Sequence, residues 1–402
     1  MTASNGASGA AEDPFPAPSR KLRLGIVGGG RGSFIGPVHL NGARLSGRWD
    51  LVAAAPSSRP DVARASGRDL FLQDDRVHVD FRSMAEDEAA RADGIDAVAI
   101  VTPNATHHAV ARAFMDRGID VISDKPLTST MADALDLVEA QRRTGLVFGV
   151  TYSFAGHAMV RQARQMVADG ALGAVRQIHV EFFQEWAIAP ASQGGKGAAW
   201  RLDEAQVGAA FTTGDIGTHA HHLAAFVSGL QMTQVRADFH VSGAPKPLED
   251  TAFMHVRYAG DVPGTLMVSQ AAAGTHCGLR LRIFGEKAGL EWDQEKPETL
   301  RHAPFGEPAR IISRGYGAGM GNEASRFVRM PRGHPEALTD AWANLYTEFA
   351  IAVDARRSGT VLPDGLLRCP DVVDGARGVR FVEAAVESAK AGGIWVGCSL
   401  EP

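Results

Sequence analysis

Asp215 and His219 combine two residue types that move or orient protons, at a spacing that lets them act together. Four positions apart on a helical turn, the two side chains share one face, so the histidine can exchange a proton while the carboxylate orients it or a substrate hydroxyl. His221 and His222 follow at once and give the run the look of a metal site. Because no second cluster of ligand residues accompanies it in the sequence, we assign no metal and expect acid and base chemistry at His219.

A glycine-rich loop follows the first apolar run of the chain, residues 22–28. Ser33 stands where the pattern G-x-G-x-x-G has its third glycine, and Gly36 comes three positions later. Glycine fills 45 of 402 positions, so the loop alone carries little weight. Its place between a predicted strand and a predicted helix is the stronger argument, because backbone N–H groups there can bind a dinucleotide pyrophosphate. We therefore predict contacts to NAD(P) from Gly28, Gly30, Arg31, Gly32, Ser33, Phe34 and Ile35.

The end of the second predicted strand, residues 51–55, bears on the choice between NAD and NADP. NAD enzymes usually carry an acidic residue there, whereas a cation suits the 2′-phosphate of NADP. Here the strand runs into Ser57, Ser58 and Arg59 without a carboxylate. This weakly favours NADP, although an Arg59 that only faces solvent explains the pattern nearly as well. We predict cofactor contacts from these three residues and leave the choice between NAD and NADP open.

Two further motifs follow the apolar runs 97–101 and 120–123. The first reads Thr102, Pro103, Asn104 and, after two residues, His107; the second reads Asp124, Lys125, Pro126. With the glycine loop and the run from Gly214 to His219, they resemble the Gfo/Idh/MocA oxidoreductases, the family of glucose-fructose oxidoreductase and inositol dehydrogenase. The family motif E-K-P has a glutamate where this chain has Asp124, which is shorter by one methylene. The resemblance extends over nearly the whole chain from about Leu22.

The resemblance implies that Lys125 is catalytic and that Asp215 and His219 join it around the reacting hydroxyl, with Asp215 as the orienting partner. It also implies cofactor contacts from Thr102, Pro103, Asn104, His107, Asp124 and Lys125. Sugar binding needs flat apolar surface together with hydrogen-bond donors. We predict substrate contacts from Lys125, Tyr152, Trp200, Arg201, Asp215, His219 and His334. For each of the aromatic residues alone, a role in the core or at an interface is at least as well supported.

Apolar runs alternate with helical patterns in the first 150 residues, which predicts an α/β fold that begins with a doubly wound parallel sheet of Rossmann type. Strands are expected at 22–28, 51–55, 97–101, 120–123 and 147–151, with helices at 38–45, 107–117 and 131–144. After a helix at 157–168, strands without crossover helices predict an α+β domain with a large, mostly antiparallel open sheet. These strands are expected at 175–183, 235–241, 251–258, 264–270 and 279–284, with helices at 338–355 and 375–391. We divide the chain into a disordered tail (1–20), an NAD(P)-binding domain (21–150) and a substrate and oligomerisation domain (151–402).

Composition indicates small-molecule chemistry. The net charge of −5 arises from 41 basic and 46 acidic residues without a basic run, so neither nucleic acid nor an anionic membrane is an expected partner. Three widely spaced cysteines suggest no disulfide framework, and no apolar run is long enough to span a membrane. We expect a cytoplasmic homo-oligomer, a dimer or tetramer as is common for this family, in which Phe182, Phe183 and Trp186 line a sheet face that pairs subunits.

Three functions fit these residues. The leading hypothesis is a dehydrogenase that oxidises a secondary hydroxyl of a sugar, glycoside or cyclic polyol such as inositol. The second is a redox-neutral glycoside hydrolase or lyase that uses bound NAD transiently. The third is a non-catalytic sugar or cofactor sensor, which Lys125, Asp215 and His219 disfavour because binding alone does not require that set.

Overall fold

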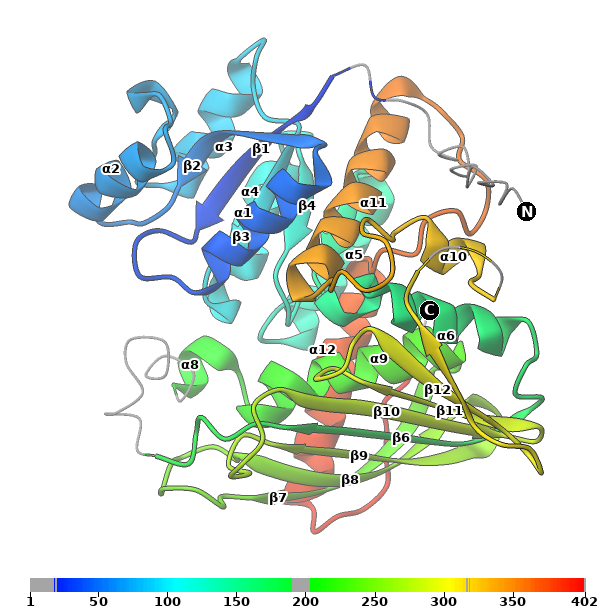
Figure 1. Cartoon of the computed structure of the whole chain (residues 1–402). Helices are drawn as coiled ribbons and strands as arrows, with labels where there is room; N and C mark the ends of the chain where they lie inside the picture. Colours follow the sequence, from blue (N-terminus) through cyan, green and yellow to red (C-terminus); the bar gives the residue numbers. More distant parts are fainter. Residues whose placement is uncertain (1–17, 19, 190–202, 316, 318, 401–402) are drawn as a thin grey trace, which may run out of the picture.

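The computed structural model describes residues 18, 20–189, 203–315, 317 and 319–400. Two sheets dominate it, a parallel sheet of five strands and a mixed sheet of nine strands, which lie one above the other in Figure 1. Trp200 and Arg201, which the sequence predicts to contact substrate, lie outside the described residues.

The five-stranded sheet has the order β2-β1-β3-β4-β5, and every neighbouring pair is parallel. The predicted Rossmann-type sheet is therefore confirmed. Its strands are β1 (Leu22–Gly28), β2 (Trp49–Ala55), β3 (Ala97–Val101), β4 (Asp120–Ser123) and β5 (Phe148–Val150). Its helices are α1 (Ile35–Ser46), α2 (Pro60–Asp69), α3 (Phe81–Ala90), α4 (His107–Met115) and α5 (Met131–Thr144). Helices α2 and α3 were not predicted, because both are short and rich in polar residues and alanine.

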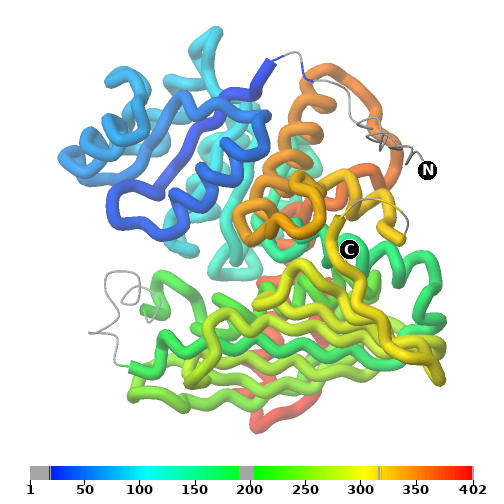
Figure 2. Tube along the Cα trace, viewed as in Figure 1, coloured from blue at the N-terminus to red at the C-terminus, as the bar shows by residue number. Residues whose placement is uncertain are grey.

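Two helices from the end of the chain also cover this sheet. Helix α11 (Leu338–Ser358) packs against α1, and its residues Trp342 and Tyr346 share one apolar core with Leu24 of β1. Helix α12 (Val372–Lys390) packs against α5 on the other face, where Val379 joins the core around Val121. In Figures 1 and 2 the orange segment of α11 lies beside the blue N-terminal part. The last third of the chain thus completes the Rossmann core.

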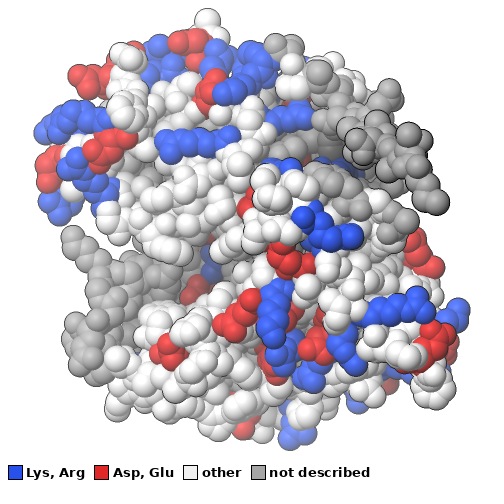
Figure 3. All heavy atoms as spheres, in the orientation of Figure 1, with Lys and Arg blue, Asp and Glu red and all other residues white. Residues whose placement is uncertain are grey.

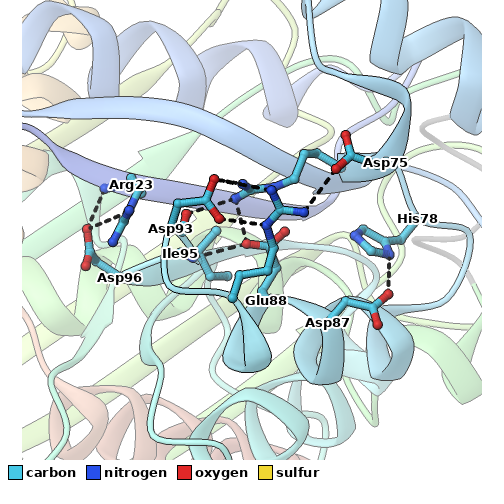
Figure 4. A network of polar contacts seen from close by, with 10 residues as sticks. Arg23, Asp75, His78, Asp87, Glu88, Asp93, Ile95 and Asp96 are labelled. Carbon is cyan, nitrogen blue, oxygen red and sulfur yellow. Dashed lines mark hydrogen bonds and ion pairs between the residues drawn. The ribbon is translucent and has the colours of Figure 1, made fainter.

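The amino ends of β1 and β3 are held by two buried carboxylates (Figure 4). Glu88 accepts hydrogen bonds from the guanidinium of Arg76 (2.7 Å) and from the backbone N–H of Ile95 (3.1 Å). Asp96 accepts from the backbone N–H of Arg23 at 2.7 Å. Because the strands are parallel, these contacts stabilise the edge opposite to the one where ligands of such sheets bind.

The nine-stranded sheet has the order β13-β12-β11-β10-β6-β9-β8-β7-β14. Only the β6–β9 pair is parallel, so the prediction of a large, mostly antiparallel sheet is confirmed. Its strands are β6 (Val175–Phe183), β7 (Met232–His240), β8 (Thr251–Tyr258), β9 (Val262–Ser269), β10 (Gly278–Gly285), β11 (Ala288–Asp293), β12 (Thr299–Pro304), β13 (Arg310–Ser313) and β14 (Val396–Gly397). Strands β11, β12, β13 and β14 were not predicted.

One face of this sheet packs against α6 (Ala158–Ala168), α9 (Thr218–Ser228) and α12. Two short helices complete the fold, α8 (Glu204–Val207) and α10 (Asn322–Ser325). Phe182 lies in the core between sheet and helices, in contact with Phe154 at 5.7 Å between ring centroids. The expectation that Phe182 and Phe183 share an outer, subunit-pairing face is therefore wrong for Phe182, since consecutive residues of a strand point to opposite faces. Among the described residues, no helix is long and apolar enough to cross a membrane.

Candidate active site

The carboxyl ends of β1 and β3 are neighbours at the point where the strand order reverses. β2 lies on one side of β1, and β3, β4 and β5 follow on the other. In open α/β sheets the crevice outside such strand ends binds ligands. The loops after β1, β3 and β4 leave this edge toward the nine-stranded sheet (Figure 1), and Figure 3 shows a recess between the two parts of the molecule.

The glycine loop after β1 forms a cradle that side chains would fill. A Cβ on Gly28, whose φ is +83°, would lie 2.7 Å from the carbonyl oxygen of Val101 at the end of β3. A Cβ on Gly30 would lie 2.6 Å from the carbonyl oxygen of Pro56, to which the backbone N–H of Gly30 donates. Only glycine therefore lets the loop pack this closely against the end of β3 and Pro56, as the tight turn of a dinucleotide site requires.

Gly36 has the role that the G-x-G-x-x-G pattern gives to its third glycine. A Cβ on Gly36 would lie 2.5 Å from the carbonyl oxygen of Gly29, so helix α1 can approach β1 only with a glycine there. Ser33, which occupies the position of the third glycine in the pattern, accepts a hydrogen bond from the N–H of Gly36 at 3.2 Å. Helix α1 has no acidic residue in its first turn. The loop is thus a longer form of the dinucleotide loop, and its residues fit an anionic cofactor.

Two arginines at the rim of the cradle already have acidic partners. Arg31 forms a bidentate ion pair with Asp69 at the end of α2, in which Nη2 lies 2.7 Å from Oδ1. Arg59, directly before α2, contacts Asp61 at 2.8 Å, and its backbone N–H donates to Ser57. Both pairs are exposed to solvent, so a ligand phosphate can compete for either guanidinium.

The other predicted members of the loop have open surroundings. Phe34 precedes α1 with 79% of its side chain exposed, and a Cβ on Gly32 would meet no atom within 4 Å. Ile35 is the first residue of α1, and Ser58 lies between Ser57 and Arg59. These residues stay predicted cofactor contacts.

The loop after β3 ties the Rossmann sheet to its surroundings. His107 is buried, and its two ring nitrogens lie 2.8 Å from the carbonyl oxygen of Thr102 and 2.9 Å from that of Pro126. The side-chain amide of Asn104 donates to the carbonyl of Val207 in α8 at 3.3 Å. The carbonyl of Pro103 accepts from the Thr106 hydroxyl. His107 thus joins the loops that follow β3 and β4, and Asn104 joins the two halves of the chain.

Lys125 and Asp215 meet across the two halves of the chain. Nζ of Lys125 donates to Oδ1 and to the backbone carbonyl of Asp215, each at 2.8 Å. The backbone N–H of Lys125 in turn donates to the carboxylate of Asp124, which also accepts from the hydroxyl of Thr151 at 3.0 Å. Both members of the pair are partly buried. The ammonium is therefore held at the edge where the glycine cradle lies.

Asp215 lies on a π-helical turn, Thr213–Gly217, that leads into α9. Buried Glu249 accepts hydrogen bonds from the backbone N–H groups of Phe211 and Thr213 at 3.0 and 2.8 Å and so holds the start of this turn. π-helical turns are frequent at functional sites because they widen the helix locally. The sequence predicted one helical face for Asp215 and His219, but it did not predict the π turn or Glu249.

His219 packs among aromatic rings beside this pair. Its ring centroid lies 4.9 Å from that of Phe154 and 5.9 Å from that of Tyr152, and 9% of the residue is exposed. Burial, reinforced by the Lys125 charge, lowers the pKa of His219 well below its usual range. Nδ1 is buried and has no hydrogen-bond partner in the described part of the chain, so Nε2 is the nitrogen left for a ligand. A neutral histidine with one accessible nitrogen can accept a proton.

Tyr152 and His334, two further predicted substrate residues, have different surroundings. Tyr152 is fully buried and stacks on His222 at 4.3 Å between ring centroids. The Tyr152 ring also packs against the ring of His219. His334 is exposed in a loop, and its own backbone carbonyl accepts a hydrogen bond from the guanidinium of Arg314. His221 stacks on Phe381. Within the described ranges, no group of three or more His, Cys, Asp or Glu side chains could hold a metal ion.

Comparison with known proteins decides the family. A model described as an oxidoreductase family with an NAD-binding Rossmann fold matches residues 22–152, and a model of the GFO/IDH/MocA C-terminal domain matches residues 160–291. The uncharacterized oxidoreductase YfiI of Bacillus subtilis is 34% identical over 94% of this chain and 97% of its own length. The chain belongs to the Gfo/Idh/MocA oxidoreductase family. The resemblance that the motifs indicated is confirmed.

Solved structures of the family are similar over nearly the whole chain. An oxidoreductase from Sinorhizobium meliloti is 43% identical, with a TM-score of 0.84 over 94% of this chain and 99% of the other. An inositol dehydrogenase homologue from Azotobacter vinelandii, in complex with NAD⁺, is 37% identical, with a TM-score of 0.90 over 96% and 100%. The same homologue has been solved with NADH and myo-inositol, with a TM-score of 0.87.

Membership in the family makes this protein an NAD(P)-dependent oxidoreductase. The glycine cradle of Gly28, Gly30 and Gly36 fits that cofactor on the geometry given above. The candidate site thus joins the glycine loop and Lys125 of the Rossmann half with Asp215 and His219 from the helix layer of the nine-stranded sheet.

Proposed function

We propose that this protein oxidises a secondary hydroxyl of a sugar, glycoside or cyclic polyol by hydride transfer to bound NAD(P). The observation that carries the proposal is the contact of 2.8 Å between Nζ of Lys125 and Oδ1 of Asp215 at the edge of the glycine cradle. An ammonium held in this way, with the neutral ring of His219 nearby, is suited to a reaction that removes a hydroxyl proton.

Each residue has one role in this proposal. Nζ of Lys125 binds the reacting oxygen and stabilises the negative charge that develops as the proton leaves. Nε2 of His219 accepts that proton, because the lowered pKa of the buried ring leaves it unprotonated before the reaction. Asp215 keeps the ammonium in position through Oδ1. NAD(P)⁺ held by the glycine cradle of Gly28, Gly30 and Gly36 would supply the acceptor for the hydride of the carbinol carbon.

The substrate class is supported by a relative. Myo-inositol is bound in the Azotobacter vinelandii homologue, so cyclic polyols are the first compounds to test. On the face visible in Figure 3, basic and acidic side chains are interspersed, which suits a neutral ligand better than a polyanion.

The test is nicotinamide absorbance of the purified protein with NAD or NADP and a panel of inositols, sugars and glycosides. Net reduction of cofactor by one class of compound is the expected result. Conversion of a glycoside without net reduction would replace the proposal by a redox-neutral hydrolase or lyase. Binding of a sugar without any conversion would replace it by a sensor.

The proposal includes a homo-oligomer, a dimer or tetramer, joined through the outer face of the nine-stranded sheet. Phe253 of β8 and Phe284 of β10 are large apolar side chains with 46% and 39% of their surface exposed. Light scattering after size-exclusion chromatography tests this part separately. A monomer at micromolar concentration would contradict it.

A further inference from the structure

Gln270 is a fully buried side chain beside the candidate active site, and no sequence motif pointed to it. It directly follows β9 and has 0% of its surface exposed. Its amide nitrogen Nε2 donates to Oδ2 of Asp215 at 2.8 Å, while Oδ1 of the same carboxylate accepts from Lys125. The two oxygens of Asp215 are thus held from opposite sides, one by the nine-stranded sheet and one by the Rossmann half.

The neighbours of Gln270 determine which way its amide points. A carboxylate oxygen only accepts hydrogen bonds, so the nitrogen of the amide must face Asp215. Oε1 then accepts from the hydroxyl of Thr212 at 2.9 Å. Nε2 also lies 3.4 Å from Oε1 of Gln184, which accepts from the indole N–H of Trp186 at 3.0 Å. A flipped amide would set its oxygen against the carboxylate, where neither oxygen can donate.

The backbone of Gln270 is anchored on both sides. Its N–H donates to the carbonyl of Asp250 at 2.8 Å, and its own carbonyl accepts from the N–H of Ala187 at 2.9 Å. Side chain and backbone are therefore fixed together. The sheet thereby fixes the position of the Asp215 carboxylate through the hydrogen bond from Gln270.

We propose that Gln270 is a positioning residue for the reaction: it sets the rotation of the Asp215 carboxylate, which directs Nζ of Lys125 toward the substrate oxygen. The proposal rests on the proposed dehydrogenase function. Gln270 acts through Asp215 and has no role in cofactor binding, which belongs to the glycine cradle.

The first variant is Gln270→Met, which keeps the length of the side chain and removes the donor. A hydrogen bond to a charged group is worth enough to lower kcat roughly 10-fold to 100-fold, while KM for the cofactor stays unchanged. Gln162→Met is the matched control, because Gln162 is also buried and accepts from the N–H of Gly321, which directly precedes α10. It should lower thermal stability without changing kcat.

The second variant, Gln270→Glu, distinguishes positioning from a merely structural role. The titratable groups that face Asp215 are the Lys125 ammonium and, on α9, the neutral ring of His219. A protonated carboxyl at position 270 can donate to Oδ2 as the amide does, but two facing carboxylates cannot both ionise without strong repulsion. The ratio of kcat in this variant to wild-type kcat should therefore be near one at acid pH and fall about tenfold as pH rises. The wild type and Gln162→Met should show no such fall.

Three outcomes bear on the proposal. A constant ratio across the pH range, together with wild-type kcat in Gln270→Met, would overturn it. If Gln270→Met does not fold, Thr212→Val removes only the donor to Oε1 and should lower kcat in the same direction by a smaller factor. An unchanged kcat in folded Thr212→Val would then count against the proposal.

Failure of the proposed function can be recognised separately. If the wild type reduces NAD and NADP with no compound of the panel, the function is wrong, but the positioning contact can still be tested. Carbon-13 NMR of lysine-labelled protein follows the side-chain signal of Lys125, which is assigned with Lys125→Ala. Gln270→Met should change the chemical shift of that signal and Gln162→Met should not, and an unchanged signal in folded Gln270→Met overturns the inference without any substrate.

Discussion

Gly36 of α1 packs against Gly29 so closely that a Cβ on Gly36 would lie 2.5 Å from the Gly29 carbonyl oxygen and 2.6 Å from its Cα. Both atoms belong to the backbone, so the clash cannot be relieved by a side-chain rotation. The contact holds the start of α1 against the end of β1, where the cofactor pyrophosphate is expected. Gly36 therefore determines the geometry of the cradle although it lies outside the pattern G-x-G-x-x-G.

Gly36→Ala should weaken NAD(P) binding roughly tenfold or more, which is ~1.4 kcal/mol, because α1 must move away from the loop. Titration of nicotinamide fluorescence measures the affinity. Gly397→Ala is the control, since a Cβ there meets no atom within 4 Å. Equal affinity in both variants would show that the loop tolerates a side chain at position 36.

Lys125→Ala should lower kcat about 10²- to 10⁴-fold, the usual contribution of a positioned acid or base group. The protein should stay folded, because Lys125 belongs to none of the apolar cores that the described residues form. Circular dichroism checks the fold, and steady-state kinetics check turnover. Lys296→Ala removes an exposed lysine and should leave kcat unchanged. Near-normal turnover in Lys125→Ala would contradict the proposed mechanism.

His221 makes the stability of the protein depend on pH. Burial lowers the pKa of His221 from 6.5 to about 3, so between these values the unfolded chain binds a proton that the folded chain does not. The free energy of unfolding is then fully present above pH 6.5 and falls as pH decreases through that value. At pH 5 the loss from this one residue is about 2 kcal/mol.

His221→Phe should reduce that acid sensitivity. Phenylalanine can keep the stacking on Phe381, and the buried Nδ1 of His221 has no hydrogen-bond partner within the described residues to lose. Urea unfolding at pH 7.5 and pH 5 should show a drop in unfolding free energy that is about 2 kcal/mol smaller than in the wild type. An equal drop in both proteins would mean that His221 does not titrate in this range.

Arg59→Ala should distinguish the two cofactors. β2 ends without a carboxylate, and Arg59 is paired only with exposed Asp61 in the described structure, so a 2′-phosphate can compete for its guanidinium. An exposed pair of this kind is worth at most about 1 kcal/mol, so kcat/KM with NADP should fall up to about fivefold and kcat/KM with NAD should not change. Equal changes with both cofactors would show that Arg59 faces solvent only.

The local patterns of the sequence predicted local structure well. Apolar runs that end in glycine or in a polar motif became the parallel strands, because a buried strand needs a continuous apolar run whatever surrounds it. Elements that lack such an apolar pattern were not predicted. Helix α3 has few large apolar residues, and β13 is short and partly exposed, so neither has a periodic apolar pattern to detect.

The sequence by itself determined the two kinds of sheet, most of their longer strands, the glycine loop and the residue types of the candidate site. Only the tertiary structure decided which of them meet: Lys125 with Asp215, ninety positions apart, and Asp215 with Gln270, fifty-five positions further on. It also showed that Gly36 replaces the missing glycine of the pattern, since only the packing of α1 on β1 reveals where a Cβ cannot fit. The physical reason is the same in each case. Periodicity reports how one segment buries its own apolar face, whereas a hydrogen bond between distant segments depends on how the two sheets and their helices pack.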